Sequence, residues 1–317
     1  IPQHSNNTFT FADLCGAPGG FSEYILYFCN NVMNIRAKGY GMSLLGTNQH
    51  GTGFQWNLSQ PVADGTFQII QGSDGSGDIY NWDNIQFLKE SIENDTKDQQ
   101  QRLTNKESKS SLCDLVVADG GLDAQRESEI QEYLTFELFV NQVAAALLLL
   151  NHGGNFVLKF FGSENYETRL VIQYLYTVFD RISIVKPIIS RPASAERYLV
   201  CFGYNRNNEA TELWNAKDWR DQMLSVASNN GRQEMLAPKM QVTLDAKLED
   251  YLNTISHEIF LLNIKACGEI ISMLDDMTDV DMAPKDGEKQ SNGDGGIDTK
   301  GYQVLWKLKG REALPTV

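Results

Sequence analysis

Short apolar runs alternate along the first 202 residues with stretches in which apolar side chains recur at helical spacing. The runs predict strands near 11–13, 37–45, 67–72, 112–119, 155–161, 181–186 and 196–202. Phe21, Tyr24, Ile25 and Phe28 open the first helix, and further helices are expected near 127–150 and 166–179. This alternation predicts an α/β fold with a mostly parallel sheet between helices.

Between the first strand and the first helix lies a turn with three glycines and a proline, from Asp13 to Gly20. Glycines let a backbone approach a ligand closely, and the new helix points its unpaired N–H groups at it. The glycine spacing fits neither G-x-G-x-x-G nor the phosphate-binding G-x-x-x-x-G-K-[ST]. We therefore expect a ligand against this turn, although a plain strand-to-helix turn is the alternative.

The second part of the chain predicts helices at 210–226 and 244–274, followed by an acidic, Gly-rich segment at 276–298. The expected organisation is a core at 1–205, a helical extension at 206–275 and a linker with a tail at 276–317. His152-Gly-Gly is expected to end the core helix that precedes it.

Composition is that of a globular protein, with 42% hydrophobic and 21% charged residues. The longest apolar run, 143–150, is too short to span a bilayer and no signal sequence opens the chain, so we expect no membrane and an intracellular protein. Five scattered cysteines without C-x-x-C spacing indicate neither a disulfide framework nor a metal site. Since residue 1 is Ile rather than Met, we expect the chain to begin inside a longer one.

The net charge of −14 opposes nucleic-acid binding, which needs lysine and arginine at the phosphates. Much of this charge comes from residues 275–298, where acids outnumber lysines. By contrast, Arg181, Lys186, Arg191 and Arg197 face only Glu196 within residues 181–197. The sequence therefore predicts a local basic strip that could bind a polyanion.

Four segments, taken in order, resemble the FtsJ-like RNA 2′-O-methyltransferases: Asp13-Leu-Cys-Gly-Ala-Pro-Gly-Gly-Phe21, Val117-Ala-Asp-Gly-Gly121, residues 154–160 and residues 190–201. Gly39-Tyr-Gly-Met-Ser-Leu44 is similar to the cap-specific mRNA (nucleoside-2′-O-)methyltransferase 1 type. The resemblance implies a Rossmann-like S-adenosylmethionine methyltransferase fold, with a seven-stranded, mostly parallel sheet, an antiparallel last strand and a helical C-terminal extension. It also implies methyl transfer to the ribose 2′-OH of the first transcribed nucleotide of capped mRNA.

Two other functions remain open. The same fold could methylate riboses of another RNA, such as rRNA or tRNA. Alternatively, the chain could be a non-catalytic module that binds RNA or a cap.

The resemblance implies a Lys-Asp-Lys-Glu catalytic tetrad, of which Asp119, Lys159 and Glu196 match the last three members. Lys159 would be the base, Asp119 would orient it, and Glu196 would steady it electrostatically. No lysine precedes Phe11 and Lys38 follows the turn, so the first member has no match in the chain. Read alone, a lysine in an apolar run is more typical of an edge strand from which it reaches the surface.

The resemblance also assigns residues to S-adenosyl-L-methionine, from the turn, the second strand end, an adenine-binding loop and the strand before Asp119: Asp13, Cys15, Gly16, Ala17, Pro18, Gly19, Gly20, Met42, Ser43, Leu44, Asp78, Ile79 and Asp119. Residues expected to contact capped RNA are Arg191, Ser194, Arg197, Glu127 and Glu129. For Arg197, pairing with Glu196 or a surface acid is an equal alternative. A nuclear location, with the cytoplasm as the alternative, and association with the transcription machinery through other parts of a longer chain are also implied.

Overall fold

The fold is built around one seven-stranded sheet, seen in a computed structural model that describes residues 8–44, 55–104, 112–121, 130–206, 215–228 and 244–282. The strand order is β3-β2-β1-β4-β5-β7-β6. The strands are β1 (Phe9–Leu14), β2 (Ala37–Met42), β3 (Phe67–Ile69), β4 (Cys113–Ala118), β5 (Leu150–Phe160), β6 (Phe179–Val185) and β7 (Arg197–Tyr204). Among these strands β7 alone runs opposite to the rest, and its pairings with β5 and β6 are antiparallel, which confirms the predicted mostly parallel sheet.

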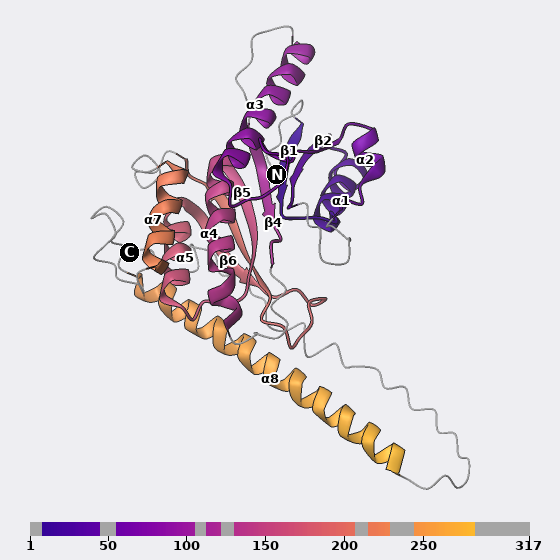
Figure 1. Ribbon diagram of the computed structural model, residues 1–317, viewed down its shortest axis with the longest axis vertical. Helices are drawn as coiled ribbons and strands as arrows, with labels where there is room; N and C mark the ends of the chain where they lie inside the picture. Colours follow the sequence, from indigo (N-terminus) through magenta and orange to yellow (C-terminus); the bar gives the residue numbers. More distant parts are fainter. Residues whose placement is uncertain are drawn as a thin grey trace.

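Helices lie on both faces of the sheet (Figure 1). The described helices are α1 (Gly20–Tyr27), the π-helical turn η1 (Phe28–Val32), α2 (Ser59–Ala63), α3 (Trp82–Thr104), α4 (Gln131–Leu149), α5 (Tyr166–Val178), α7 (Ala216–Ser228) and α8 (Ala246–Met282). On β1, Phe11 packs with Ile25 and Leu26 of α1, whereas Ala12 joins a larger cluster with α3 and α4. The alternation of successive side chains between two apolar layers explains why β1 is apolar at almost every position.

The order of the strands places a topological switch point between β1 and β4. The chain continues from β1 toward β2 on one side and from β4 toward β5 on the other. Asp13 pairs with Val117 and Leu14 with Ala118, so the two strands end at the same level. Ligands of open α/β sheets bind beyond the carboxyl ends of strands at such a point.

The start of β5 corrects one prediction from the sequence. His152-Gly-Gly does not end the helix; α4 ends at Leu149, and β5 already runs through His152, Gly153 and Gly154. The pairing of β4 with β5 shifts register between Cys113 and Leu115, and Gly153 has a φ of 81°. Glycine supplies the left-handed conformation that such an irregularity needs, so the two glycines belong to a bulged strand.

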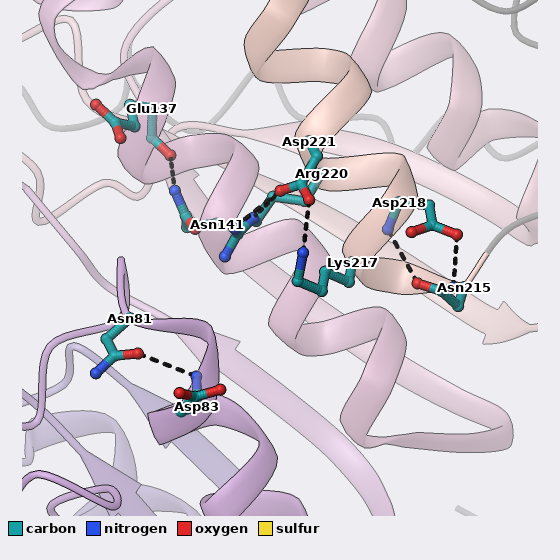
Figure 2. A network of polar contacts seen from close by, with 9 residues as sticks. All are labelled: Asn81, Asp83, Glu137, Asn141, Asn215, Lys217, Asp218, Arg220 and Asp221. Atoms are coloured by element: carbon teal, nitrogen blue, oxygen red, sulfur yellow. Dashed lines mark hydrogen bonds and ion pairs between the residues drawn. The ribbon is translucent and has the colours of Figure 1, made fainter.

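The helical extension is packed into the main apolar core. Trp219 of α7 is fully buried and its ring lies 5.1 Å from that of Tyr174 on α5. Figure 2 shows Arg220 reaching from α7 toward Asn141 of α4, with Asp221 bound by both Arg220 and Lys217. The Arg220 guanidinium also lies 5.1 Å from the ring centre of Trp82, so α7 contacts the first residue of α3.

The long helix α8 packs on the main core through its first half. Leu248, Leu252 and Ile259 join the main core, and the hydroxyl of Tyr251 accepts the backbone N–H of Ile184 on the edge strand β6. Beyond these turns the helix projects from the body of the protein (Figure 1). It continues to Met282, eight residues beyond the predicted helix end at 274.

Among the described helices, α4 alone is long and apolar enough to cross a membrane by length and composition. Within its most apolar window, 72% is buried inside the fold. Its apolar surface is therefore used by the core, against β4, β5, α3 and α7.

Candidate active site

The turn after β1 brings the backbone of three strands together. Cys15, with a φ of 56°, donates its N–H to the carbonyl of Met42 at the end of β2, at 2.7 Å. The N–H of Asp119, just beyond β4, donates to the carbonyl of Leu14 at 3.1 Å. The turn contains a cis Ala17–Pro18 bond and leads directly into α1 at Gly20. The carboxyl ends of β1, β2 and β4 therefore form one contiguous site.

Asp13 is completely buried beneath this turn. Its Oδ2 accepts the hydroxyl of Ser22 at 2.6 Å, whereas Oδ1 has no hydrogen-bond partner among the described residues. Burial raises the pKa of Asp13 to about 7, with Ser22 opposing the shift and Asp119 adding to it. A Cβ at Gly16 would overlap Oδ1 of Asp13, so this position of the turn accepts only glycine without rearrangement.

The second strand end and the loop before α3 lie against each other. Met42 and Ser43 are buried and Leu44 is half exposed. Gly77, with a φ of 70°, packs against the backbone carbonyl of Ser43 so closely that a Cβ there would overlap it. This contact places the predicted adenine-binding residue Asp78 beside residues 42–44.

Asp78 and Ile79 are held by hydrogen bonds within their own loop. Oδ1 of Asp78 accepts the N–H of Tyr80 at 2.9 Å, and its carbonyl accepts the side-chain amide of Asn84 at 3.1 Å. Ile79 is buried in the main core. One carboxylate oxygen of Asp78 therefore already has a partner, and Oδ2 is the atom that can meet a ligand.

The electrostatics of Cys15 show that these segments share one site. Burial raises the pKa of the Cys15 thiol to about 12. Asp13, Asp119 and Asp78 raise it further, whereas Lys159 lowers it. Carboxylates from three separate segments therefore act on the same turn, and their combined field favours a cationic ligand.

Asp119 and Lys159 form an ion pair, with 3.1 Å between Oδ1 and Nζ. Their side chains are 32% and 12% exposed. Lys159 is not on an edge strand, because β5 lies between β4 and β7. The pairing register places Lys159 opposite Tyr198 of β7, and the Tyr198 hydroxyl donates to the same Oδ1 of Asp119 at 2.9 Å.

Glu196 immediately precedes β7. Alternation along the strand puts it on the same side as Tyr198. Burial raises the pKa of Tyr198, and the charges of Asp119 and Glu196 add to the shift, so both acids lie close to this phenol. The structure thus brings Asp119, Lys159 and Glu196 together beyond the carboxyl ends of β4 and β5.

The residues predicted to contact RNA are not all exposed. Arg191 is exposed and Ser194 is half buried, but Arg197 is only 5% exposed. The Arg197 guanidinium lies 5.9 Å from the ring centre of Phe160 and its Nε donates to the carbonyl of Ala195. Burial lowers the pKa of Arg197, and the nearby Glu164 and Glu132 oppose that shift. The Arg197 side chain is therefore buried near Glu164 and Glu132, and it is not exposed for a phosphate contact.

The predicted basic strip is also not one surface. Lys186 is 4% exposed, and Arg181 packs over Phe202 with 5.0 Å to its ring centre, at the opposite end of β6 from Lys186. Of the four basic residues, Arg191 alone is both exposed and part of the loop 187–195 that leads to Glu196. Glu127 and Glu129 lie outside the described residues.

Sequence reasoning missed three residues that shape this site, namely Tyr198, Ser22 and Lys186. Tyr198 follows Glu196 by two positions, and this spacing within a strand was the available signal that both share a face. Ser22 and Lys186 carried no such signal, because their partners are an acid before the turn and backbone carbonyls across a loop. Among the described residues, no group of three or more His, Cys, Asp or Glu side chains is arranged to hold a metal ion.

Comparison with known proteins agrees with this arrangement. The model of the FtsJ-like methyltransferase family matches residues 3–204. This chain belongs to the FtsJ-like methyltransferase family. The matched range contains all seven strands and every candidate catalytic residue of the site described above.

Among relatives of this FtsJ-like chain, cap-specific mRNA (nucleoside-2′-O-)-methyltransferase 1 of Mus musculus is 31% identical over 270 residues, covering 84% of this chain and 30% of the relative. The protein of the same name from Trypanosoma cruzi is 36% identical over 195 residues, covering 61% and 48%. The chain thus spans about a third to a half of these relatives. A solved structure of human methyltransferase-like protein 13 in complex with SAH has 11% identity and a TM-score of 0.36, covering 69% of this chain and 83% of that one.

Proposed function

We propose that this chain transfers a methyl group from S-adenosyl-L-methionine to the ribose 2′-OH of the first transcribed nucleotide of capped mRNA. The observation that carries the proposal is the Tyr198–Asp119–Lys159 arrangement beside the turn at Asp13 to Gly20. Membership of the FtsJ-like methyltransferase family supports the reaction type. The capped substrate is supported by similarity to cap-specific mRNA (nucleoside-2′-O-)-methyltransferases 1, of which this chain matches only a part.

The residues at the turn fit the cofactor. When bound, S-adenosyl-L-methionine supplies a methyl group on a positively charged sulfur. That sulfur leaves as a neutral thioether when the methyl group is transferred. The carboxylates of Asp13, Asp78 and Asp119 surround Cys15 and complement a cation. The glycines at 16, 19 and 20 with Ala17 and Pro18 would hold its methionine part, and Met42 to Leu44 with Asp78 and Ile79 would hold its nucleoside.

Lys159 would act on the ribose hydroxyl. In its neutral form, the Nζ amine accepts the proton that the 2′-oxygen loses as it attacks the methyl carbon. Asp119 holds Nζ by the 3.1 Å contact, and Tyr198 fixes the shared oxygen of Asp119. Since the reaction needs oxygen, carbon and sulfur in line, this positioning supplies much of the rate enhancement. Glu196 stabilises the lysinium that results.

Arg191 and Ser194 would meet the RNA backbone. Arg191 is exposed in the loop that precedes Glu196, where a phosphate contact would place the ribose near Lys159. With few basic groups at the site and a net charge of −14, binding should depend weakly on salt and strongly on the cap. We place the reaction in the nucleus, where transcripts are capped, and propose that any contact with the transcription machinery involves segments outside this chain.

The test is methyl transfer by the full-length protein to short RNAs of one sequence. The three substrates are capped RNA, uncapped RNA and capped RNA already carrying a 2′-O-methyl group on its first nucleotide. We expect label from S-adenosyl-L-methionine only in the first, and loss of labelling with Lys159→Ala. Equal labelling of uncapped RNA would indicate another RNA substrate. Cofactor binding without transfer to any RNA would indicate a non-catalytic module.

A further inference from the structure

Lys186 is a buried lysine with a backbone function. It follows β6 directly, it is 4% exposed, and the catalytic residues proposed above do not include it. Its Nζ donates to the carbonyl of Ser194 at 2.6 Å and to the carbonyl of Glu196 at 3.1 Å. The loop 187–195 begins after β6, and Lys186 therefore links the carbonyls of Ser194 and Glu196, where the loop ends, to the end of β6.

The same loop holds Glu196 by its other polar groups. Oε1 of Glu196 accepts a hydrogen bond from the hydroxyl of Ser190 at 3.1 Å. The backbone N–H of Glu196 donates to Oγ of Ser194 at 3.2 Å. Two backbone bonds, from Ser190 to the carbonyl of Pro187 and from Ser194 to the carbonyl of Arg191, shape the loop between them. The carboxylate, amide and carbonyl of Glu196 are thus all fixed by groups of this loop and of Lys186.

Burying the Lys186 amine lowers the stability of the fold, because the charged group loses its hydration. Burial lowers the pKa of Lys186 to about 8; Arg197 lowers it further and Glu196 opposes the shift. An apolar side chain would fill the same space without desolvating an amine. An apolar residue could not donate the two hydrogen bonds that Lys186 makes. Their acceptors are the carbonyls of Ser194 and of Glu196 itself.

We propose that Lys186 is a positioning residue that sets Glu196 against Lys159 and Asp119. The inference deepens the proposed function and rests on it for the role of Glu196. Lys186 contacts neither RNA nor cofactor in this account. Its removal should therefore lower turnover through Glu196 and leave cofactor binding intact.

A double-mutant cycle in the full-length protein tests this assignment. Lys186→Met keeps the length and apolar stem of the side chain and removes its donors. It should lower kcat on capped RNA about tenfold and change KM for S-adenosyl-L-methionine less than twofold. In a Glu196→Ala background the same substitution should change kcat less than twofold. Lys217→Met, at an exposed ion pair on α7, is the matched control and should be neutral in both backgrounds.

An equal loss of kcat in both backgrounds, or weaker cofactor binding, would overturn the inference because Lys186 would then act on the fold in general. A second readout does not require any RNA substrate. Amide hydrogen exchange in Lys186→Met should accelerate about tenfold at Ser190, Ser194 and Glu196, and remain unchanged at Cys15 and Asp119. Unchanged exchange in the loop overturns the positioning role. Accelerated exchange in a protein that methylates no RNA supports the positioning role and contradicts the proposed function.

Discussion

The Tyr198 hydroxyl and the Lys159 ammonium meet at one atom, Oδ1 of Asp119, at 2.9 and 3.1 Å. The two donors come from neighbouring antiparallel strands, β7 and β5, whose register places them directly opposite each other. Asp119 itself follows β4. Three strands therefore determine where the Lys159 amine lies, and a ribose hydroxyl would meet an amine of fixed direction.

Tyr198→Phe should lower kcat about tenfold, since a hydrogen bond to a charged group contributes roughly 1.5–3 kcal/mol. KM for the cofactor should stay within about twofold, because Tyr198 acts on Asp119 alone in this account. Steady-state methyl transfer measures both constants. Tyr204→Phe, at the other end of the same strand, is the control. A full-activity Tyr198→Phe protein would contradict the role of the phenol.

Gly16→Ala should weaken cofactor binding roughly 10- to 100-fold, because the added methyl group overlaps the buried Asp13 carboxylate and strains the turn by about 1–3 kcal/mol. Gly268→Ala makes the same chemical change on α8, outside the site, where nothing lies within 4 Å of the added carbon. Calorimetric titration of both variants with S-adenosyl-L-methionine measures the difference. Equal affinities would show that the turn does not hold the cofactor.

Cofactor affinity should fall as the pH decreases through about 7. Burial raises the pKa of Asp13 from 3.8 to about 7, so the free folded protein holds this proton up to about pH 7. A cationic ligand favours the carboxylate, so binding near pH 6 should release a proton. Calorimetry in two buffers with different ionisation enthalpies counts that proton. Asp13→Asn should abolish both the release and the pH dependence, and persistence of either in this variant would exclude Asp13.

The same pKa shift makes a stability prediction. Between about pH 4 and 7 the unfolded chain has lost the Asp13 proton while the folded chain retains it. The contribution of Asp13 to stability is therefore fully present below about pH 4 and is lost as the pH rises through 7. Asp13→Asn should accordingly gain stability relative to the wild type as the pH rises over this range, in thermal unfolding at fixed salt.

Arg191 and Arg197 should respond differently to alanine substitution. Arg191→Ala removes an exposed charge and should raise KM for RNA a few-fold, with a smaller salt dependence and unchanged stability. Arg197→Ala removes a buried guanidinium that donates to the carbonyl of Ala195 and should lower the free energy of unfolding by roughly 1.5–3 kcal/mol. Filter binding and chemical denaturation separate the two effects. An Arg197→Ala protein of normal stability with weakened RNA binding would restore the phosphate role for Arg197.

The sequence predicted the strand, turn and helix around Asp13 because local chemistry determines them. Apolar residues lead into a glycine turn, and apolar side chains then recur at helical spacing. The pairing of Asp119 with Lys159 was implied only by the family resemblance, because the residues alone favoured an edge strand for Lys159, whereas β5 lies inside the sheet. Local sequence patterns could not predict contacts between residues far apart in the chain. The bulge at Gly153 depends on the register between β4 and β5, and the burial of Arg197 depends on acids from α4 and the segment before α5.

The end of helix α8 shows a second limit of prediction from the sequence. The sequence predicted a helix over 244–274, before the acidic, Gly-rich segment, yet α8 continues to Met282. The first half of α8 is anchored through Tyr251 and Leu252, and helix propagation beyond an anchored segment costs little per residue. Tertiary anchoring thus extended a helix beyond the point at which composition indicated its end.

The most direct measurement of the central claim is the transfer of labelled methyl groups by the full-length protein and its Lys159→Ala variant to capped RNA with an unmodified first ribose. The account predicts one methyl group per RNA at the 2′-oxygen of the first transcribed nucleotide, no labelling of RNA already methylated there, and loss of transfer in the variant. Full activity of Lys159→Ala, or methylation at a base, would contradict the account.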